Sequence, residues 1–501
     1  MKAIFLLSQK QLSDDGRVMR VKLLFGLVAI LLAACSSPRG ATGPAGPTDL
    51  ALGPLLFAHP LVVEEGRESG FLGPFFYEKH GVENNQTYTQ QSFRPLITTV
   101  RMDDNSTETI ELLFPLLTYH RTGKEYRVQI GQLLSFSGGD SQTGGEENRT
   151  TIFPFYFSRR SGNPERDYTA LVPFYGTIKN RMLRDEINFF MLPLYLHSRR
   201  GDVETWNYLA PIFHVRRGNN LKGWQVWPLY GQEEKTIGPE GPGERGGHRW
   251  RFIAWPFYHE SEEGIGTENH RTFNALLPLY AVRRSPKGDL TSVLWPFFNK
   301  STDKGKNYTE YSAPWPIWVF GKGPERDKFH LWPLYGHDRT KTSSKKFYFG
   351  PLYQTSELNT DKILRQRRRL LAWLYQHTHE ERKETGVIKD RRDLWPLFTH
   401  VRDGDTRSLQ IFSPLEPLMP GNKKGIARNY SPLFALWHSR ENTATGSATS
   451  SFLFNLYRGE RTPESKKCSL LFGLIRYKKD EEGKELRLLW LFPFKSRAAA
   501  P

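Results

Sequence analysis

Four arginines form the densest group of residues that could bind a charged ligand. Arg365, Arg367, Arg368 and Arg369 stand together just before Leu370. A guanidinium group binds phosphate or carboxylate through parallel hydrogen bonds, so this group predicts an anion site. A solvated turn explains the same residues, because short charged runs mostly face water. The four arginines are the candidate anion-binding residues of the chain.

Histidines supply the best candidate for a metal site. His377-Thr378-His379 is followed by Glu380, and alternate residues of a strand share a face, so two imidazoles could meet one ion. An exposed strand end explains the same residues. We adopt that second interpretation and predict neither a metal nor any other cofactor.

Motifs that mark common enzyme classes are missing from the sequence after Cys35. It contains no Walker-type phosphate loop, no Cys-x-x-Cys pair and no Gly-x-Ser-x-Gly elbow. Paired carboxylates such as Glu64-Glu65 and Glu233-Glu234 are adjacent in sequence, so their side chains point apart. The sequence therefore predicts a protein that is not an enzyme.

A short motif recurs along the chain: a large apolar residue, then Pro, then Leu or Phe, then Tyr or Phe. Trp227-Pro228-Leu229-Tyr230 and Trp332-Pro333-Leu334-Tyr335 are clear copies. The prolines follow one another mostly at steps of 17 to 22 residues. Successive copies contain Pro154, Pro173, Pro193, Pro211, Pro228, Pro256, Pro278, Pro296, Pro316, Pro333 and Pro351. This regular spacing indicates a repeat architecture.

The segments between motif copies carry turn signals such as Arg200-Gly201-Asp202 and Asp403-Gly404-Asp405. Aromatic and β-branched segments bounded by such turns, without a helical period, predict strands in an up-and-down meander. One strand and one turn per repeat gives roughly twenty strands over residues 51–497, which form one repetitive β domain. The fold class is therefore all-β and antiparallel.

The motif is expected near the middle of each strand. In the run from Phe189 to Leu196 both faces of such a strand would be apolar, so the motif residues are predicted to form the core. Tyr and Phe two residues after Pro would form an aromatic ladder across the sheet. A twisted sheet of roughly twenty strands must close or fold on itself, which favours a barrel, with a β-propeller or a stacked β-sandwich as the alternative.

The N-terminal segment has the form of an export signal. Two basic residues, Arg20 and Lys22, precede an apolar run from Leu23 to Leu32, which is too short to span a bilayer. The following Leu32-Ala33-Ala34-Cys35 resembles the lipobox of bacterial lipoproteins. Residues 1–34 are the predicted signal segment, with Met19 as an alternative start, and residues 35–50 are the lipidated cysteine and a flexible tether.

The lipobox resemblance implies that Cys35 is acylated and anchors the chain in a membrane. Ser36 stands where Asp would retain a lipoprotein in the inner membrane, so the resemblance implies the bacterial outer membrane. The chain carries a net charge of +17, and the part from Cys35 onward keeps +14. A basic surface in the cell envelope favours an anionic lipid or polymer as partner rather than nucleic acid.

The Pro and aromatic repeats resemble those of uncharacterised bacterial envelope proteins, a likeness that implies no activity. The sequence therefore predicts a noncatalytic outer-membrane lipoprotein with a repetitive β scaffold or binding surface. The alternative is a membrane-embedded β-barrel that transports or conducts a hydrophobic or anionic molecule.

Overall fold

The fold is one very long antiparallel sheet. The computed structural model describes residues 50–52, 55–83, 85–141, 145–237, 246–481 and 483–497. In these residues 44 strands form a single sheet, and β11 with β12 makes a separate small hairpin. The predicted all-β antiparallel meander is confirmed, although with about twice the expected number of strands. The signal segment, Cys35 and the tether up to residue 49 lie outside the described residues.

The elements follow one another with short turns between them. The first half of the sheet contains β1 (Leu50–Leu52), β2 (Leu56–Pro60), β3 (Gly66–Phe71), β4 (Phe76–Glu83), β5 (Gln86–Phe93), β6 (Ile97–Met102), β7 (Thr107–Leu112), β8 (Leu117–Thr122), β9 (Glu125–Ile130), β10 (Leu134–Gly138), β11 (Asp140–Ser141), β12 (Gly145–Glu146), β13 (Asn148–Ile152), β14 (Tyr156–Arg160), β15 (Tyr168–Leu171), β16 (Tyr175–Arg181), β17 (Arg184–Phe190), β18 (Tyr195–Arg200), β19 (Val203–Tyr208), β20 (Phe213–Gly218), β21 (Leu221–Val226), β22 (Tyr230–Lys235) and β23 (Gly247–Ile253).

The second half carries the helices of the described residues. It contains β24 (Tyr258–Ile265), β25 (Arg271–Leu276), β26 (Tyr280–Arg284), β27 (Gly288–Val293), β28 (Phe298–Asp303), β29 (Tyr308–Ser312), β30 (Trp318–Lys322), β31 (Arg326–Leu331), β32 (Tyr335–Thr340), β33 (Ser343–Tyr348), β34 (Tyr353–Asn359), β35 (Ile363–Leu370), β36 (Tyr375–Arg382), β37 (Ile388–Leu394), β38 (Phe398–Asp403), β39 (Thr406–Ile411), η1 (Pro420–Asn422), α3 (Lys423–Asn429), α4 (Ser431–Phe434), β40 (Trp437–Asn442), β41 (Ser447–Phe452), β42 (Tyr457–Arg461), β43 (Lys466–Leu470), η2 (Leu471–Gly473), β44 (Ile475–Asp480), β45 (Gly483–Leu488) and β46 (Phe492–Arg497).

The repeated motif forms turns, and its predicted place in mid-strand is wrong. Residues 191–194 connect β17 to β18, with Met191 at a φ of +45° and a cis peptide bond before Pro193. The N–H of Leu194 donates to the carbonyl of Met191 across the turn (2.8 Å). Because Pro has no N–H for a sheet ladder, a turn accommodates it where a central strand does not. One repeat is therefore two short strands and two turns.

Neighbouring motif turns are hydrogen-bonded to each other. The N–H of Leu192 donates to the carbonyl of Pro173, and the N–H of Ala210 donates to the carbonyl of Pro193, both at 2.7 Å. The backbone pairing of the sheet thus continues through the stacked turns at this edge. We call this edge, made of the motif turns and the strand ends beside them, the apolar rim.

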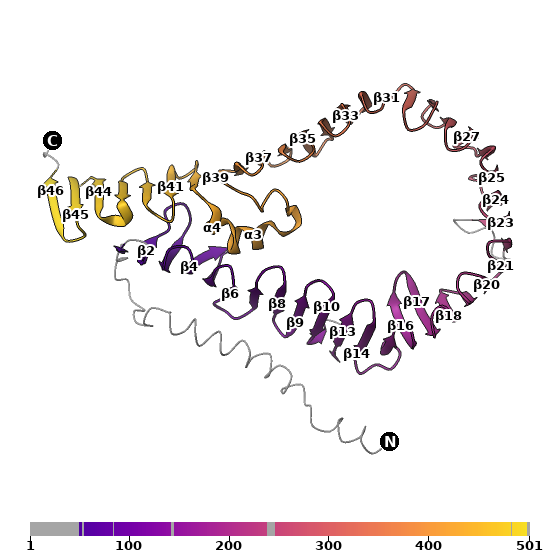
Figure 1. The fold of residues 1–501 in the computed structure, drawn as a ribbon, viewed down its shortest axis with the longest axis horizontal. Coiled ribbons are helices and arrows are strands. Elements are labelled where there is room, and N and C mark those ends of the chain that lie inside the picture. Colours follow the sequence, from indigo (N-terminus) through magenta and orange to yellow (C-terminus); the bar gives the residue numbers. More distant parts are fainter. Residues whose placement is uncertain are drawn as a thin grey trace, which may run out of the picture.

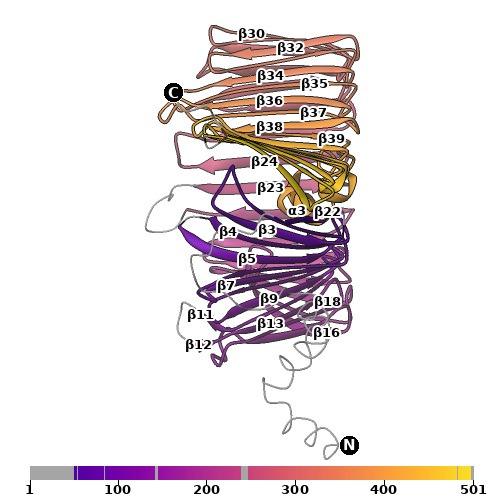
Figure 2. The same ribbon diagram turned by 90° about the vertical axis from the view of Figure 1, so that its left-hand side faces the viewer.

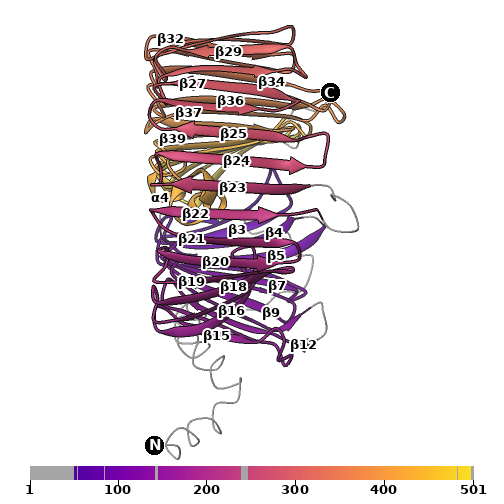
Figure 3. The ribbon, with the colours of Figure 1, turned by 90° about the vertical axis from the view of Figure 1, so that its right-hand side faces the viewer.

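The opposite ends of the strands carry the predicted polar hairpins. Gly201 and Asp202 connect β18 to β19, and Asn219 with Asn220 connects β20 to β21. Gly201 and Asn220 have positive φ values of 59° and 58°, which Gly and Asn tolerate. We call this edge the polar rim. Figure 2 and Figure 3 show the strands running between the two edges along the whole body.

The sheet is not closed into a barrel, so that prediction is wrong. Every strand of the main sheet pairs with its neighbours in chain order, and β1 and β46 form its two free edges. A barrel needs hydrogen bonds between its first and last strands. Figure 1 shows instead that the sheet bends round in a wide loop until β39 and β41 lie across from β2 and β4, while β44 to β46 continue past them. One continuous sheet also excludes the propeller and sandwich alternatives.

Side chains join the two overlapping ends of the sheet. Glu68 of β3 forms an ion pair with Arg458 of β42 (2.7 Å), and Arg458 also binds Glu460 (2.8 Å). Burial by itself raises the pKa of Glu68, but the Arg458 guanidinium overcomes this effect and lowers that pKa to about 2. The ends are thus held by buried charge pairs instead of a backbone ladder.

The helical insertion between β39 and β40 strengthens the same overlap. Asn429 of α3 donates to Glu111 of β7 (2.5 Å), and the hydroxyl of Tyr430 donates to the carbonyl of Phe114 (2.7 Å). Ile426 is 1% exposed. Figure 1 shows α3 and α4 on the inside of the loop, between the two ends of the sheet.

The face of the sheet turned toward the inside of the loop is its better-buried side. We call it the inner face, and it carries Glu68 and Arg458. Small and large side chains alternate along it: a Cβ on Gly336 would lie 2.2 Å from the ring of Phe347 on the next strand. The buried core cluster lies on this face and consists of Phe157, Tyr168, Ala170, Ile178 and Phe189. None of these five residues belongs to a motif turn, although Val172 and Leu192, the first residues of two motif copies, pack against the cluster. The prediction that the motif residues themselves form the core is therefore wrong for most of the motif.

Candidate functional site

The register divides the four candidate arginines between the two faces of β35. Arg365, Arg367 and Arg369 alternate along the strand and share the inner face, whereas Arg368 points to the outer face and is exposed. Three of the four predicted anion-binding residues therefore lie together, and Arg368 is separated from them by the thickness of the sheet.

Residues that the sequence analysis did not select complete the group. Thr378 of β36 pairs in register with Arg367 on one side and with Arg391 of β37 on the other. Lys423, the first residue of α3, interacts electrostatically with Arg391 and Arg367. We call Arg367, Arg369, Thr378, Arg391 and Lys423 the inner basic cluster.

Acidic groups balance only part of this charge. Arg365 binds Glu380 (Nε to Oε2, 2.8 Å), and Arg391 binds Asp393 (Nε to Oδ2, 2.8 Å). Within the described residues, Arg367 and Arg369 form no ion pair. Cationic charge therefore exceeds anionic charge on this part of the inner face.

Burial and mutual repulsion act on two cations of the cluster, Arg367 and Lys423. Burial lowers the pKa of the Arg367 guanidinium, and the neighbouring Arg369 and Arg365 lower it further. Burial also lowers the pKa of Lys423, with Arg391 as the next cause. Both shifts show that the charged forms are less favourable here than in water, which a bound anion would reverse.

The two candidate metal-binding histidines are both hydrogen-bonded to an acidic neighbour. His377 Nε2 and His379 Nδ1 both contact Oδ2 of Asp390, at 2.8 and 3.3 Å, and Arg392 Nε donates to the other oxygen (3.0 Å). Burial raises the pKa of Asp390, but the bonds to the two histidines outweigh it and lower that pKa. Across the described residues, no group of three or more His, Cys, Asp or Glu side chains is arranged to hold a metal ion.

The apolar rim is the most extensive surface feature. From β2 to β46, the paired residue nearest this rim is apolar or aromatic in every described strand of the main sheet except β29, where it is Ser312. Neighbouring rings contact each other along the row: the centroids of Tyr195 and Tyr208 are 5.6 Å apart, and those of Tyr335 and Tyr348 are 5.2 Å apart. The predicted aromatic ladder therefore exists, at the rim instead of mid-sheet.

Large turn side chains of this rim face solvent. Leu229 is 66% exposed, and Trp255 and Phe257 are 50% and 56% exposed. Soluble monomers rarely expose a continuous apolar patch beyond a few hundred Å², so a rim along the whole sheet indicates an interaction surface.

Charge appears on the outer face only a few residues above this rim. A row of charged residues crosses four successive strands in register, each one four positions along its strand from the rim-side end. These residues are Glu186, Arg199, Glu204 and Arg217. The next strands continue the series with Lys222, Glu234, Arg249 and Glu262. At about 3.3 Å per residue, this charged row lies about 13 Å above the rim.

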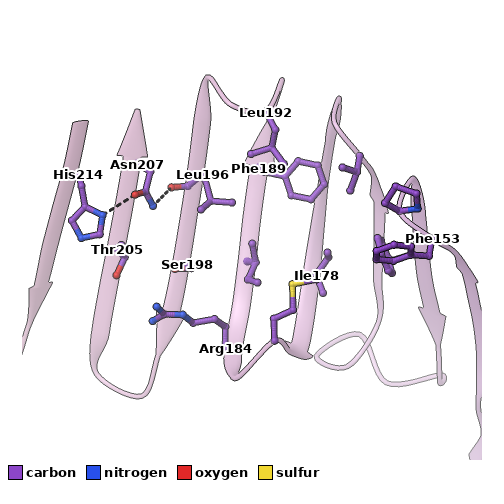
Figure 4. Close-up of a pocket in the computed structure, with 15 residues that line it drawn as sticks. Phe153, Ile178, Arg184, Phe189, Leu192, Leu196, Ser198, Thr205, Asn207 and His214 are labelled. Atoms are coloured by element: carbon purple, nitrogen blue, oxygen red, sulfur yellow. Dashed lines mark hydrogen bonds between the residues drawn. The ribbon is translucent and has the colours of Figure 1, made fainter. Parts of the chain in front are cut away.

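A hollow of about 580 Å³ on the inner face is lined by Phe157, Ile178 and Phe189 of the core cluster, by apolar residues packed against them, and by polar residues at one side. Figure 4 shows Phe189, Ile178 and Leu196 on neighbouring strands, with Asn207 and His214 at one side joined by a hydrogen bond (2.7 Å). Burial lowers the pKa of His214, and the nearby Arg216 lowers it further. Because its apolar walls belong to the core cluster and the residues packed against it, we assign no separate site to the hollow.

No protein-family model matches the sequence, and no curated protein matches it either. Among the described residues, no helix is long and apolar enough to cross a membrane. Function is therefore inferred from the geometry of the rim and of the inner face.

Proposed function

We propose that this chain is a noncatalytic, lipid-anchored scaffold of the bacterial outer membrane, which rests on the lipid surface by its apolar rim. The anchor is Cys35, by its resemblance to a lipobox. The observation that supports the proposal is the continuous exposed apolar row of the rim, which water solvates poorly. The scaffold holds the polar rim and the faces of the sheet away from the lipid.

The depth of the apolar layer favours resting on the membrane over spanning it. The charged row that begins with Glu186 and Arg199 lies about 13 Å above the rim, whereas a hydrocarbon core is about 30 Å thick. Amphipathic elements that lie in the interface bury their apolar side by about 5–10 Å, a depth that the rim turns can supply. A spanning sheet would also need paired edges, and β1 and β46 are unpaired edges of this one.

The basic composition supports the same partner. With Cys35 as first residue the chain carries a charge of +14, which attracts it to anionic lipid headgroups. The predicted alternative, an embedded barrel that conducts or transports, has no closed sheet to support it.

A chain that cannot be acylated tests the proposal. Full-length protein with Cys35→Ser is mixed with vesicles containing anionic phospholipid, and binding is followed by flotation. Rim tryptophans such as Trp255 and Trp295 should shift their emission to the blue and be quenched by lipids brominated near the headgroup. Cys35→Ser protein that stays in the aqueous fraction with unchanged emission contradicts the proposal.

A further inference from the structure

Buried polar atoms without partners mark one place on the inner face. Among the described residues, the Nε atoms of Arg367 and Arg369, Nη2 of Arg391 and Oγ1 of Thr378 are shielded from solvent and form no hydrogen bond. Most buried polar atoms in proteins have a partner, because leaving one unpaired is unfavourable. Four such atoms on three successive strands indicate that a ligand supplies the missing acceptors.

The register brings these groups within reach of one small ligand. Arg367, Thr378 and Arg391 occupy one row across β35, β36 and β37. With strands about 4.8 Å apart, the outer two Cα atoms are about 10 Å apart, and Arg369 lies about 7 Å along the strand from Arg367. Arginine side chains that start at these distances on one face can converge on a single anion.

The acids nearby are bound by Arg391 and by neighbouring hydroxyl groups, and neither forms an ion pair with Arg367 or Arg369. Asp393 accepts hydrogen bonds from Arg391 and from the hydroxyl of Thr399 (3.0 Å). Glu416 accepts from the hydroxyl of Ser431 (2.7 Å), and its other oxygen lies 3.6 Å from Nη2 of Arg391. The charges of Arg367 and Arg369 therefore remain to be balanced from outside the chain, whereas Lys423 is attracted by Asp393 and Glu416 as well as repelled by Arg391 and Arg367.

We propose that the inner basic cluster binds a phosphate group through Arg367, Arg369 and Arg391, with Lys423 and Thr378 as further donors. A phosphate is tetrahedral and carries up to two negative charges, so its oxygens accept bonds from donors on several strands at once. Guanidinium forks and an ammonium group together suit this ligand better than a planar carboxylate. The site stands on its own geometry and does not depend on the proposed seating on lipid.

The phosphate can belong to a soluble molecule or to a lipid headgroup. Arg369 directly precedes Leu370, a residue of the apolar rim, so the cluster begins one residue above that rim. This is the height at which a headgroup would stand if the rim were in lipid. The experiment therefore uses one probe for each source: inorganic phosphate, and vesicles of phosphatidylglycerol.

The test compares two faces of one strand in the full-length chain with Cys35→Ser. Arg367→Gln combined with Arg369→Gln removes the site, and Arg368→Gln is the matched control on the outer face. Inorganic phosphate at constant ionic strength should bind the parent chain and raise its melting temperature. The double variant should bind at least about tenfold more weakly, as expected for the loss of two charge-assisted bonds, while the control stays within about twofold.

The vesicle arm identifies the source of the phosphate. A loss of vesicle binding by the double variant, but not by Arg368→Gln, assigns the site to a lipid headgroup; equal vesicle binding by both assigns it to a soluble phosphate. The proposal is overturned if the parent chain binds neither probe, or if the control loses as much affinity as the double variant.

Folding is monitored separately. Without phosphate, the double variant should melt no lower than the parent chain, since it loses repelling, partly buried cations. A clearly lower melting temperature would show that the arginines support the fold, and this would overturn the proposal. Lys423→Gln, on α3 outside the sheet, is an independent variant that should also weaken phosphate binding.

Discussion

The two rims of the sheet have the same kind of backbone structure but side chains of opposite polarity. At both rims, short turns connect antiparallel strands, yet the apolar rim exposes Leu229 and Phe257 while the polar rim exposes Gly201 and Asp202. Met182 and Leu183, at 66% and 83% exposed, are an apolar exception on the polar rim. The comparison teaches that in a single-layer sheet the ladder sets the fold, whereas the side chains at each edge set what that edge contacts.

The largest expected effect comes from removing the apolar character of one rim. Leu229, Phe257, Leu279 and Phe297 are all at least half exposed, so changing them together to Ser should leave folding intact. If each side chain contributes about 1 kcal/mol to insertion, vesicle affinity should fall by about a thousandfold in the Cys35→Ser chain. Flotation over a range of lipid concentrations measures this affinity.

The matched control changes four exposed residues of the polar rim. Glu325, Lys341, Asp361 and Lys362 are changed to Ser, which leaves the net charge unaltered. Vesicle affinity should stay within about threefold of the parent, because these side chains face away from lipid. If both quadruple variants lost the same amount of vesicle affinity, the two rims would not differ in lipid binding, which would contradict the proposal.

A second prediction concerns the overlap that places the apolar rims of both sheet ends on the same side. The pKa of Glu68 is about 2 in the folded protein and has its ordinary value of 4.5 in the unfolded chain. The folded state therefore stabilises the ionised carboxylate. This contributes about 3 kcal/mol above pH 4.5, which is lost as the pH falls through 4.5 toward 2. Protection of the β3 and β42 amides from hydrogen exchange, taken relative to the intrinsic exchange rate at each pH, should fall over this interval.

Glu68→Gln provides the comparison for that pH dependence. The variant lacks the titrating carboxylate, so exchange in β3 should be faster than in the parent at pH 6 and should converge with it near pH 2. An identical pH dependence in both proteins would show that the Arg458 pair does not hold the overlap.

A third prediction contrasts a core residue with a rim residue of the same hairpin. Phe189 is 5% exposed and Leu194 is 48% exposed. Phe189→Ala should lower the free energy of unfolding by about 3 kcal/mol, and Leu194→Ala by about 0.5 kcal/mol or less. Denaturant midpoints measure both. Equal destabilisation would mean that the rim is packed in the free protein.

The smallest effect is expected from lengthening a polar turn. Gly-Ser inserted after Gly305, in the turn between β28 and β29, adds only loop entropy and should cost about 0.6 kcal/mol or less. The same insertion after Pro228 interrupts the bond from the N–H of Trp255 to the Pro228 carbonyl (2.7 Å) and should destabilise more. The difference in melting temperature between the two insertions tests whether the motif turns are part of the ladder.

The fold class could be predicted from the sequence because turn residues and repeat spacing are local signals. The motif was predicted in mid-strand instead of in turns because an apolar run such as residues 189–196 has the same composition whether it forms a strand or a turn. The missing N–H of Pro193 was the signal for a turn. If each motif copy is placed in a turn, each repeat contains two strands instead of one, and the expected number of strands doubles. Closure was beyond reach, since the curvature of a sheet depends on small twists summed over all strands.

The candidate site was predictable in part. Alternation along a strand already separates Arg368 from Arg365, Arg367 and Arg369, so the sequence contained the division between faces. Arg391 and Thr378 join the cluster only through the register of β35 to β37, which needs the lengths of both intervening turns. Lys423 reaches it through an insertion whose path no periodicity describes.

Strictly sequential pairing also governs how such a chain can change in evolution. In the main sheet each hairpin forms backbone ladders only with the hairpins beside it, so duplication or loss of one repeat adds or removes two strands and leaves every other strand register intact. The perimeter of the loop then changes in steps of about 9.6 Å. The two ends of the sheet meet through side chains such as Arg458 instead of a fixed ladder, so a change in the perimeter would break no backbone ladder where they overlap.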